Sequence, residues 1–207
     1  VGFSIRWRKQ FLDKLGKSDE NLNVIDLLSG LGENWTFLKN NFPNANFHAL
    51  DFSEEMISQS YKKKQKIFED NLDLCCEDML NNNLKSNYYD IISCAYGLKT
   101  FNNEQLEILA KEVNRILKPN GKFSFVEVSK PKSQFLFYFY RFYLGKIIPI
   151  LGKLFLGNPD NYKMLWIYTQ NFGVSEKVKE LFERYNLKVN LDSYFGGCST
   201  GISGKKL

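Results

Sequence analysis

The sequence predicts an α/β fold built around a doubly wound, mostly parallel sheet. Short apolar runs of strand length alternate with amphipathic helical patterns through most of the 207 residues, and this alternation is typical of βαβ units. The runs are apolar almost throughout, as expected of strands that are covered on both faces. A glycine-containing turn follows the first run, at the place where such folds bind ligands.

Five apolar runs are expected to be the parallel strands. Each has strand length and is followed by a turn or by a helical pattern. They are residues 23–28, 46–50, 72–76, 90–95 and 121–128.

Two of the intervening segments carry clear helix signals. Ser53 is a favourable N-cap with acidic residues in the first turn and lysines in the last, which predicts a helix over 53–68. Residues 103–117 place leucine, valine and isoleucine on one face, and Lys118-Pro119-Asn120-Gly121 then ends the helix and turns the chain.

The last third departs from the alternation. Residues 133–170 are rich in aromatic side chains and are expected to form a helical insertion. A helix over 174–185 follows, and residues 187–206 predict two strands joined by a glycine-containing turn, an antiparallel hairpin. The whole chain, 1–207, is therefore interpreted as one domain with a helical lid at about 133–170.

Composition and charge exclude several classes of protein. With 43% hydrophobic and 25% charged residues the chain is typical of a globular protein, and its net charge of +5 is spread widely, so we expect no nucleic-acid binding. The four cysteines, Cys75, Cys76, Cys94 and Cys198, show no CxxC spacing and are expected to be buried thiols of a cytosolic protein. Residues 135–155 are too often interrupted by charges and proline to span a membrane.

The turn after the first strand, Gly30-Leu31-Gly32, raises the question of its ligand. A dinucleotide fingerprint has a third glycine three residues further on, but Trp35 stands there. The spacing also fails the pattern of a phosphate-binding P-loop. A dinucleotide and a phosphate held by a P-loop are therefore both disfavoured as ligands.

Three acids lie at the ends of the first three strands and face the same rim of the sheet. They are Asp26, Asp51 and Asp78. An acid after the second strand can accept hydrogen bonds from both hydroxyls of a ribose. Three acids beside a glycine turn suit a ligand with an adenosine and a positive centre, and S-adenosylmethionine is such a ligand. Taken singly, each acid is equally explained as a helix cap or a solvated loop residue.

Four stretches resemble class I S-adenosylmethionine-dependent methyltransferases, and more narrowly the ubiquinone and menaquinone biosynthesis C-methyltransferases. They are VIDLLSGLGE, HALDFSEEMI, DIISCAYGLKTFNN and LKPNGKFSFVEVSKP. The resemblance implies a Rossmann-like, mostly parallel seven-stranded sheet with a C-terminal antiparallel hairpin and a helical lid. It also implies S-adenosylmethionine as cofactor, a small apolar acceptor such as a prenylated quinol, and no metal.

The same resemblance assigns residues to the cofactor. It places the methionine half beside the glycine turn, the ribose at the end of the second strand, the adenine after the third, and the sulfonium beside residues 93–96. The residues implied are Asp26, Ser29, Gly30, Gly32, Asp51, Phe52, Asp78, Met79, Ser93 and Ala95.

Several positions depart from the pattern of this family. Leu31 replaces a small hydroxyl residue, Lys99-Thr100 replaces the usual Arg-Asn, and the chain around Ser203 lacks an expected histidine and arginine. The family's leading segment is also mostly missing. Methylation of another small or lipid-like acceptor on oxygen or nitrogen therefore stays open, as does a cofactor-binding protein without catalysis.

Carbon methylation of a quinol requires a group that favours the phenolate. Lys99 is the first candidate for this role, assisted by Tyr162 or Tyr96, and its alternative is a solvated loop lysine. Glu127, near the end of the fifth strand, either faces the pocket or hydrogen-bonds a loop.

The aromatic insertion suggests how a prenyl tail is accommodated. Residues 135–168 supply many apolar side chains together with lysines and Arg141, which suits a peripheral contact with a membrane surface. The competing interpretation is a lid whose aromatic side chains pack on the sheet. We expect a cytoplasmic protein with or without this membrane contact, and a homodimer is left open.

Overall fold

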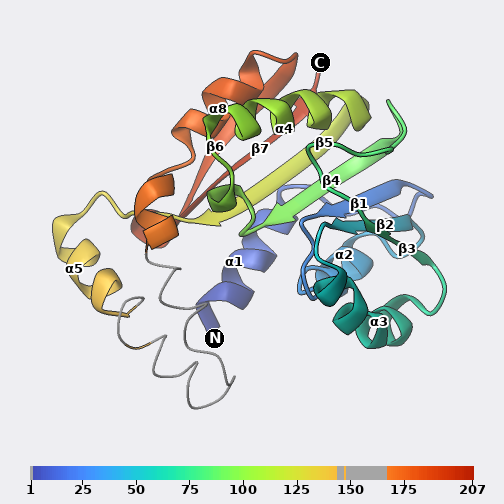
Figure 1. The fold of residues 1–207 in the computed structure, drawn as a ribbon, viewed down its shortest axis with the longest axis horizontal. Coiled ribbons are helices and arrows are strands. Elements are labelled where there is room, and N and C mark those ends of the chain that lie inside the picture. Colours follow the sequence, from blue (N-terminus) through green and yellow to red (C-terminus); the bar gives the residue numbers. More distant parts are fainter. Residues whose placement is uncertain (1, 144–146, 148–166) are drawn as a thin grey trace.

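The computed structural model describes residues 2–143, 147 and 167–207, and it contains a seven-stranded sheet in the order β3-β2-β1-β4-β5-β7-β6 (Figure 1). β7 is antiparallel to both of its neighbours, and β1 to β5 are parallel. This arrangement confirms the predicted fold class and the C-terminal hairpin. The strands are β1 (Asn23–Leu27), β2 (Asn46–Asp51), β3 (Leu72–Cys76), β4 (Tyr89–Ala95), β5 (Leu117–Val128), β6 (Leu187–Tyr194) and β7 (Ser199–Lys206).

Helices cover both faces of the sheet (Figure 1). α1, α2 and α3 pack on one face, whereas α4 and α8 pack on the other. α5 lies at the periphery of the molecule (Figure 1). The described helices are α1 (Gly2–Asp13), α2 (Trp35–Asn41), α3 (Glu54–Phe68), α4 (Asn103–Ile116), α5 (Gln134–Phe142) and α8 (Glu176–Glu183), with short 3-10 turns η1 (Leu98–Thr100) and η3 (Phe195–Gly197).

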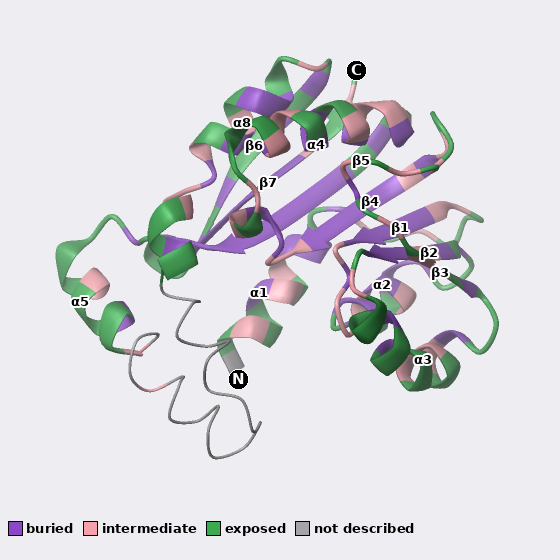
Figure 2. Ribbon diagram, viewed as in Figure 1, coloured by how far each residue is buried: buried purple, intermediate pink, exposed green. Residues whose placement is uncertain are grey.

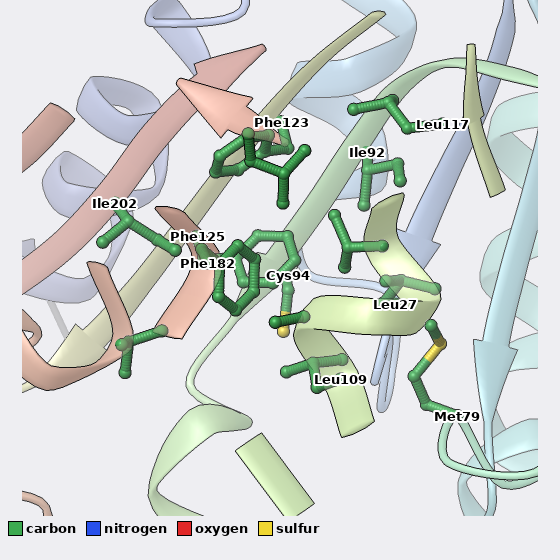
Figure 3. Packing of buried hydrophobic residues seen from close by; sticks show 14 of the residues in the cluster. Leu27, Met79, Ile92, Cys94, Leu109, Leu117, Phe123, Phe125, Phe182 and Ile202 are labelled. Atoms are coloured by element: carbon green, nitrogen blue, oxygen red, sulfur yellow. The ribbon is translucent and has the colours of Figure 1, made fainter. Parts of the chain in front are cut away.

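The central strands are buried on both sides, as Figure 2 shows for β1, β4 and β5. Because side chains alternate along a strand, Ile25 and Leu27 enter the cluster under α4 and α8, while Val24 enters the cluster under α1 and α2. Figure 3 shows side chains of β1, β4, β5 and α8 meeting in the first of these clusters. Asp26 takes the same parity as Val24, so it belongs to the face that α1 and α2 cover.

The fifth strand begins earlier than expected. We predicted residues 121–128, but β5 starts at Leu117, directly after α4. The predicted turn at Lys118–Gly121 lies inside the strand as an irregularity, because its pairing with β4 jumps from Tyr89↔Leu117 to Ile91↔Lys122. Extra residues bulge out of a ladder in this way without ending it.

The other expected elements agree with the structure more closely. The predicted strands at 23–28, 46–50, 72–76 and 90–95 end within one residue of β1 to β4. The helix over 53–68 is confirmed, with the Ser53 hydroxyl accepting the Met56 amide. The helix over 103–117 ends one residue early, and the helix over 174–185 shortens to α8.

Three features differ from the expectations or lie partly outside the described residues. α1 was not expected. The insertion at about 133–170 is helical at α5 and at 167–172, whereas residues 144–146 and 148–166 lie outside the described residues. All four cysteines are free as expected, but only Cys94 and Cys198 are buried. Cys75 is partly exposed and Cys76 is exposed, because both lie at the end of the edge strand β3.

The described ranges contain no helix with both the length and the apolar character that crossing a membrane requires.

Candidate active site

The carboxylate of Asp26 is buried inside the site at the end of β1, with 1% of the residue exposed. Its Oδ1 accepts hydrogen bonds from Ser93 Oγ at 2.6 Å and from Asn34 Nδ2 at 2.9 Å. Its Oδ2 is buried without a hydrogen-bond partner in the described part of the chain. Burial raises the pKa of Asp26 to about 6, although both hydrogen bonds act in the opposite direction.

The loop after β1 needs its glycines for different reasons. Gly32 has a φ of +69°, and a Cβ there would come within 2.4 Å of the Trp35 ring, so this position permits α2 to pack closely. Gly30 has a φ of +53°, and a Cβ there would meet nothing within 4 Å. The backbone at Gly30 therefore borders open space, as a loop that holds a ligand requires.

Asp51, the last residue of β2, ties this loop to the neighbouring strand. Its Oδ2 accepts the Gly30 amide at 2.8 Å, and its Oδ1 accepts the Ser53 amide at 3.0 Å. Each carboxylate oxygen has a second lone pair, so the group can still accept from a bound molecule. Phe52, directly after it, is 71% exposed.

The carboxyl end of β4 lies against the same loop. Leu28 and Tyr96, each directly after its strand, have φ values of 52° and 64°. A Cβ on Gly97 would come within 2.4 Å of the Leu28 side chain, so the two strand ends approach closely. Non-glycine residues held in the left-handed region concentrate at functional sites. Ser93 and Ala95 belong to this strand, and Ser93 is the member that reaches Asp26.

α1 reaches the site through Arg8, which the sequence analysis did not identify. Arg8 Nη1 donates to Asn34 Oδ1 at 2.6 Å, and its guanidinium lies 4.7 Å from the centre of the Tyr96 ring. Burial raises the pKa of Tyr96 to about 12, so this phenol stays neutral. Asn34 was missed as well: it precedes α2 as its N-cap residue, but its side chain makes no capping hydrogen bond and binds Asp26 and Arg8 instead.

The rim after β3 is arranged less tightly. Asp78 is exposed, and its Oδ1 accepts the Leu80 amide at 2.9 Å. Met79 is fully buried in the core beside α4, where Figure 3 shows it at the edge of the cluster. The roles of Asp78 and Met79 at an adenine stay predictions.

Lys99, on η1, is held by a buried partner. Its Nζ lies 3.1 Å from Glu127 Oε1 and also donates to the Tyr96 carbonyl, and its backbone amide donates to Glu127 Oε2 at 3.1 Å. Glu127 is completely buried. The open question about Glu127 is thus answered: it binds the loop after β4, and it does so through Lys99. Tyr162, the other predicted helper, lies outside the described residues.

Several predicted site residues therefore meet at one edge of the sheet. Ser93 contacts Asp26, and the Gly30 amide contacts Asp51. Because β1 lies between β2 and β4, this edge is the topological switch point, where α/β sheets bind ligands. The arrangement offers a buried acid with an unused oxygen, an open glycine and a second acid with spare lone pairs.

Comparison with known proteins decides the family. The family model described as the ubiE/COQ5 methyltransferase family matches residues 2–206. The chain belongs to this family. It is an S-adenosylmethionine-dependent methyltransferase, as the sequence predicted, and the donor set described above fits that cofactor.

A curated relative and solved structures agree with this membership. Demethylmenaquinone methyltransferase of Staphylococcus aureus is 29% identical over 203 residues, which are 97% of this chain and 82% of the relative. A methyltransferase structure from Aquifex aeolicus matches with a TM-score of 0.68 and 17% identity, over 97% of this chain and 89% of that one. Geranyl diphosphate C-methyltransferase from Streptomyces coelicolor A3(2) has the same fold, with a TM-score of 0.69 and 10% identity over 98% and 79% of the two chains.

Asp26→Asn should change how stability depends on pH. The carboxyl holds its proton more tightly in the folded state, with a pKa of about 6, than when unfolded, near 3.8. Its contribution to stability therefore falls as the pH rises through this window, by at most roughly 3 kcal/mol, and stays low above it. Urea unfolding of the wild type and the variant from about pH 4 to about pH 8 measures this difference.

The matched control is Asp70→Asn, at an exposed acid after α3. We expect its stability relative to the wild type to change much less across the same range. A constant difference between the wild type and Asp26→Asn would contradict the described environment of Asp26.

Proposed function

We propose that this methyltransferase methylates a ring carbon of a prenylated quinol such as demethylmenaquinol. The observation that carries the proposal is the ammonium of Lys99, fixed at the carboxyl end of β4 beside the loop after β1. A fixed cation at that rim suits an acceptor that reacts as a phenolate. The likeness to demethylmenaquinone methyltransferase supports the same class of acceptor.

The cofactor residues in this proposal follow the described contacts. Asp51 accepts hydrogen bonds from the ribose hydroxyls with its remaining lone pairs, while Phe52 lies beside it. Ser29, Gly30 and Gly32 border the methionine part. Asp26 places its unpartnered oxygen toward the positive end of the cofactor. Asp78 and Met79 take the adenine side, and Ser93 and Ala95 the side of the sulfur.

The chain's own residues then have three tasks. When bound, S-adenosylmethionine supplies an electrophilic methyl group. Lys99 stabilises the negative oxygen of the acceptor, so that the neighbouring ring carbon becomes nucleophilic. Tyr96 and Tyr162 assist Lys99 at the acceptor ring. The surrounding loops hold donor and acceptor close together and keep water out.

Two other functions would use the same cofactor site. A different small or lipid-like acceptor, methylated on oxygen or nitrogen, would use the same cofactor site. A cofactor-binding protein without catalysis would use the cofactor site alone. A fixed ammonium at the end of β4 suits an acceptor that reacts as an oxyanion, which a protein without catalysis or an amine acceptor does not require. The likeness to demethylmenaquinone methyltransferase then favours a quinol methylated on carbon over methylation on oxygen.

A methyl-transfer assay with a short-chain demethylmenaquinol tests the acceptor. We expect the wild type to give a product methylated on carbon, identified by mass spectrometry and NMR. Lys99→Met should lower kcat by about 100-fold, because it removes the cation that stabilises the oxyanion. Its affinity for S-adenosylhomocysteine, measured by calorimetry, should change little.

Lys118→Met is the matched control, because it removes a lysine that pairs with Asp90 at the opposite end of β4. We expect wild-type turnover from it. Cofactor binding without transfer, or methylation on oxygen, would reject the quinol proposal.

The same proposal includes a cytoplasmic enzyme in contact with a membrane surface, where a prenylated quinol would be found. α5 presents exposed aromatic side chains and an exposed arginine, and Figure 2 shows most of this helix as exposed. Aromatic and basic side chains together favour binding at a membrane interface. The aromatic residues, exposed by 59% to 75%, are Phe135, Tyr138, Phe139 and Phe142.

Co-sedimentation with vesicles of anionic phospholipid tests this contact. The wild type should sediment with the vesicles, and the double variant Phe135→Ser/Phe139→Ser should lose about tenfold in affinity. Tyr61→Ser, at an exposed aromatic side chain on α3, is the control and should bind as the wild type does. If wild-type protein stays in the supernatant, the membrane part of the proposal is wrong.

A further inference from the structure

The carboxylate of Glu127 binds both the backbone amide and the side-chain ammonium of Lys99. Oε2 accepts the backbone amide of Lys99 at 3.1 Å, and Oε1 accepts its ammonium at the same distance. Oε1 also accepts the Val128 amide at 2.7 Å, which fixes the carboxylate itself. Both the position of η1 and the direction of the Lys99 side chain therefore depend on one acid of β5.

The ammonium of Lys99 keeps capacity for a further partner. It has three N–H bonds, of which Glu127 and the Tyr96 carbonyl use two in the described part of the chain. The side chain is 11% exposed, whereas Glu127 is not exposed at all. The ammonium of Lys99 is therefore partly accessible to solvent, whereas the carboxylate of Glu127 lies in the interior.

A buried pair of this kind is not explained by stability alone. Burying two charges costs about as much as their attraction returns, so apolar residues at the same positions would serve a fold equally well. A site that binds an anion, in contrast, needs a cation that remains protonated and does not move. The location points the same way, because η1 follows β4 at the rim where the loop after β1 lies.

Resting on the proposed function, we infer that Glu127 is a positioning residue that holds η1 in place and aims the Lys99 ammonium at the acceptor's deprotonated hydroxyl. Lys99 contacts the anionic oxygen, and Glu127 acts only through Lys99. Without the carboxylate, the ammonium loses the partner that fixes its direction. Affinity for an anionic acceptor then falls.

The test measures binding of a stable anion without turnover. The probe is 2-hydroxy-1,4-naphthoquinone, whose enolate is coloured and has the size of a quinol head group. Wild-type protein, saturated with S-adenosylhomocysteine, should bind this enolate at neutral pH. Glu127→Gln should bind it about tenfold more weakly, because the Lys99 ammonium is no longer held in place.

Two further variants separate positioning from packing. Lys99→Met should lose the enolate. The double variant Glu127→Gln/Lys99→Met should bind no more weakly than Lys99→Met alone, because Glu127 acts only through Lys99. Asp90→Asn, which removes the carboxylate of the Lys118 pair at the other end of the same strands, should behave as the wild type.

Wild-type enolate affinity in Glu127→Gln, or enolate binding by Lys99→Met equal to that of the wild type, would overturn the inference. Circular dichroism and the affinity for S-adenosylhomocysteine show whether each variant is folded. Failure of the proposed function looks different, because the enolate would still bind through Lys99 while demethylmenaquinol is not methylated.

Discussion

The buried carboxylate of Asp26 is the interaction on which the rest of the site depends. One of its oxygens joins β1 to β4 through Ser93 and to the start of α2 through Asn34. Arg8 continues this connection from Asn34 to α1 and to Tyr96. Burial of a charged carboxylate costs free energy, and the raised pKa of Asp26 reflects this cost. The other oxygen lacks a partner in the described part of the chain, and a positively charged cofactor would offset the cost there.

The sheet topology turns this single acid into a binding site. The chain leaves β1 toward β2 and returns to β4 on the other side, so loops diverge from the edge where Asp26 lies. Asp51 closes one side through the Gly30 amide, and Gly97 permits close approach of the loop after β4 on the other. Strain at Leu28 and Tyr96 is therefore placed where the two loops meet. The position of this candidate binding edge thus follows from strand order.

The sequence predicted the parts of this arrangement that depend on local patterns. Apolar runs located β1 to β4, and the cap at Ser53 located α3, because burial and capping act on neighbouring residues. Asp26, Asp51 and the glycines were recognised from spacing. The bulge in β5 was missed because proline and glycine ordinarily end an element, and here the pairing with β4 resumes beyond them.

Contacts between distant residues were beyond the reach of local patterns. Arg8 meets Asn34 across 26 positions and Lys99 meets Glu127 across 28, and neither separation carries a periodic signal. Lys99 had an ordinary interpretation as a solvated loop lysine, and Glu127 was left open between facing the pocket and hydrogen-bonding a loop. The fold brings Lys99 and Glu127 into contact. The contact, rather than either residue alone, suggests a role in binding an anion.

Hydrogen–deuterium exchange with and without S-adenosylhomocysteine tests the central claim most directly, namely that the loop after β1 and the end of β2 hold the cofactor. The account predicts slower exchange in peptides covering residues 28–35 and 51–56, where the Gly30 and Ser53 amides already bind Asp51. Unchanged exchange in both peptides, with protection confined to α8 and β6, would contradict it.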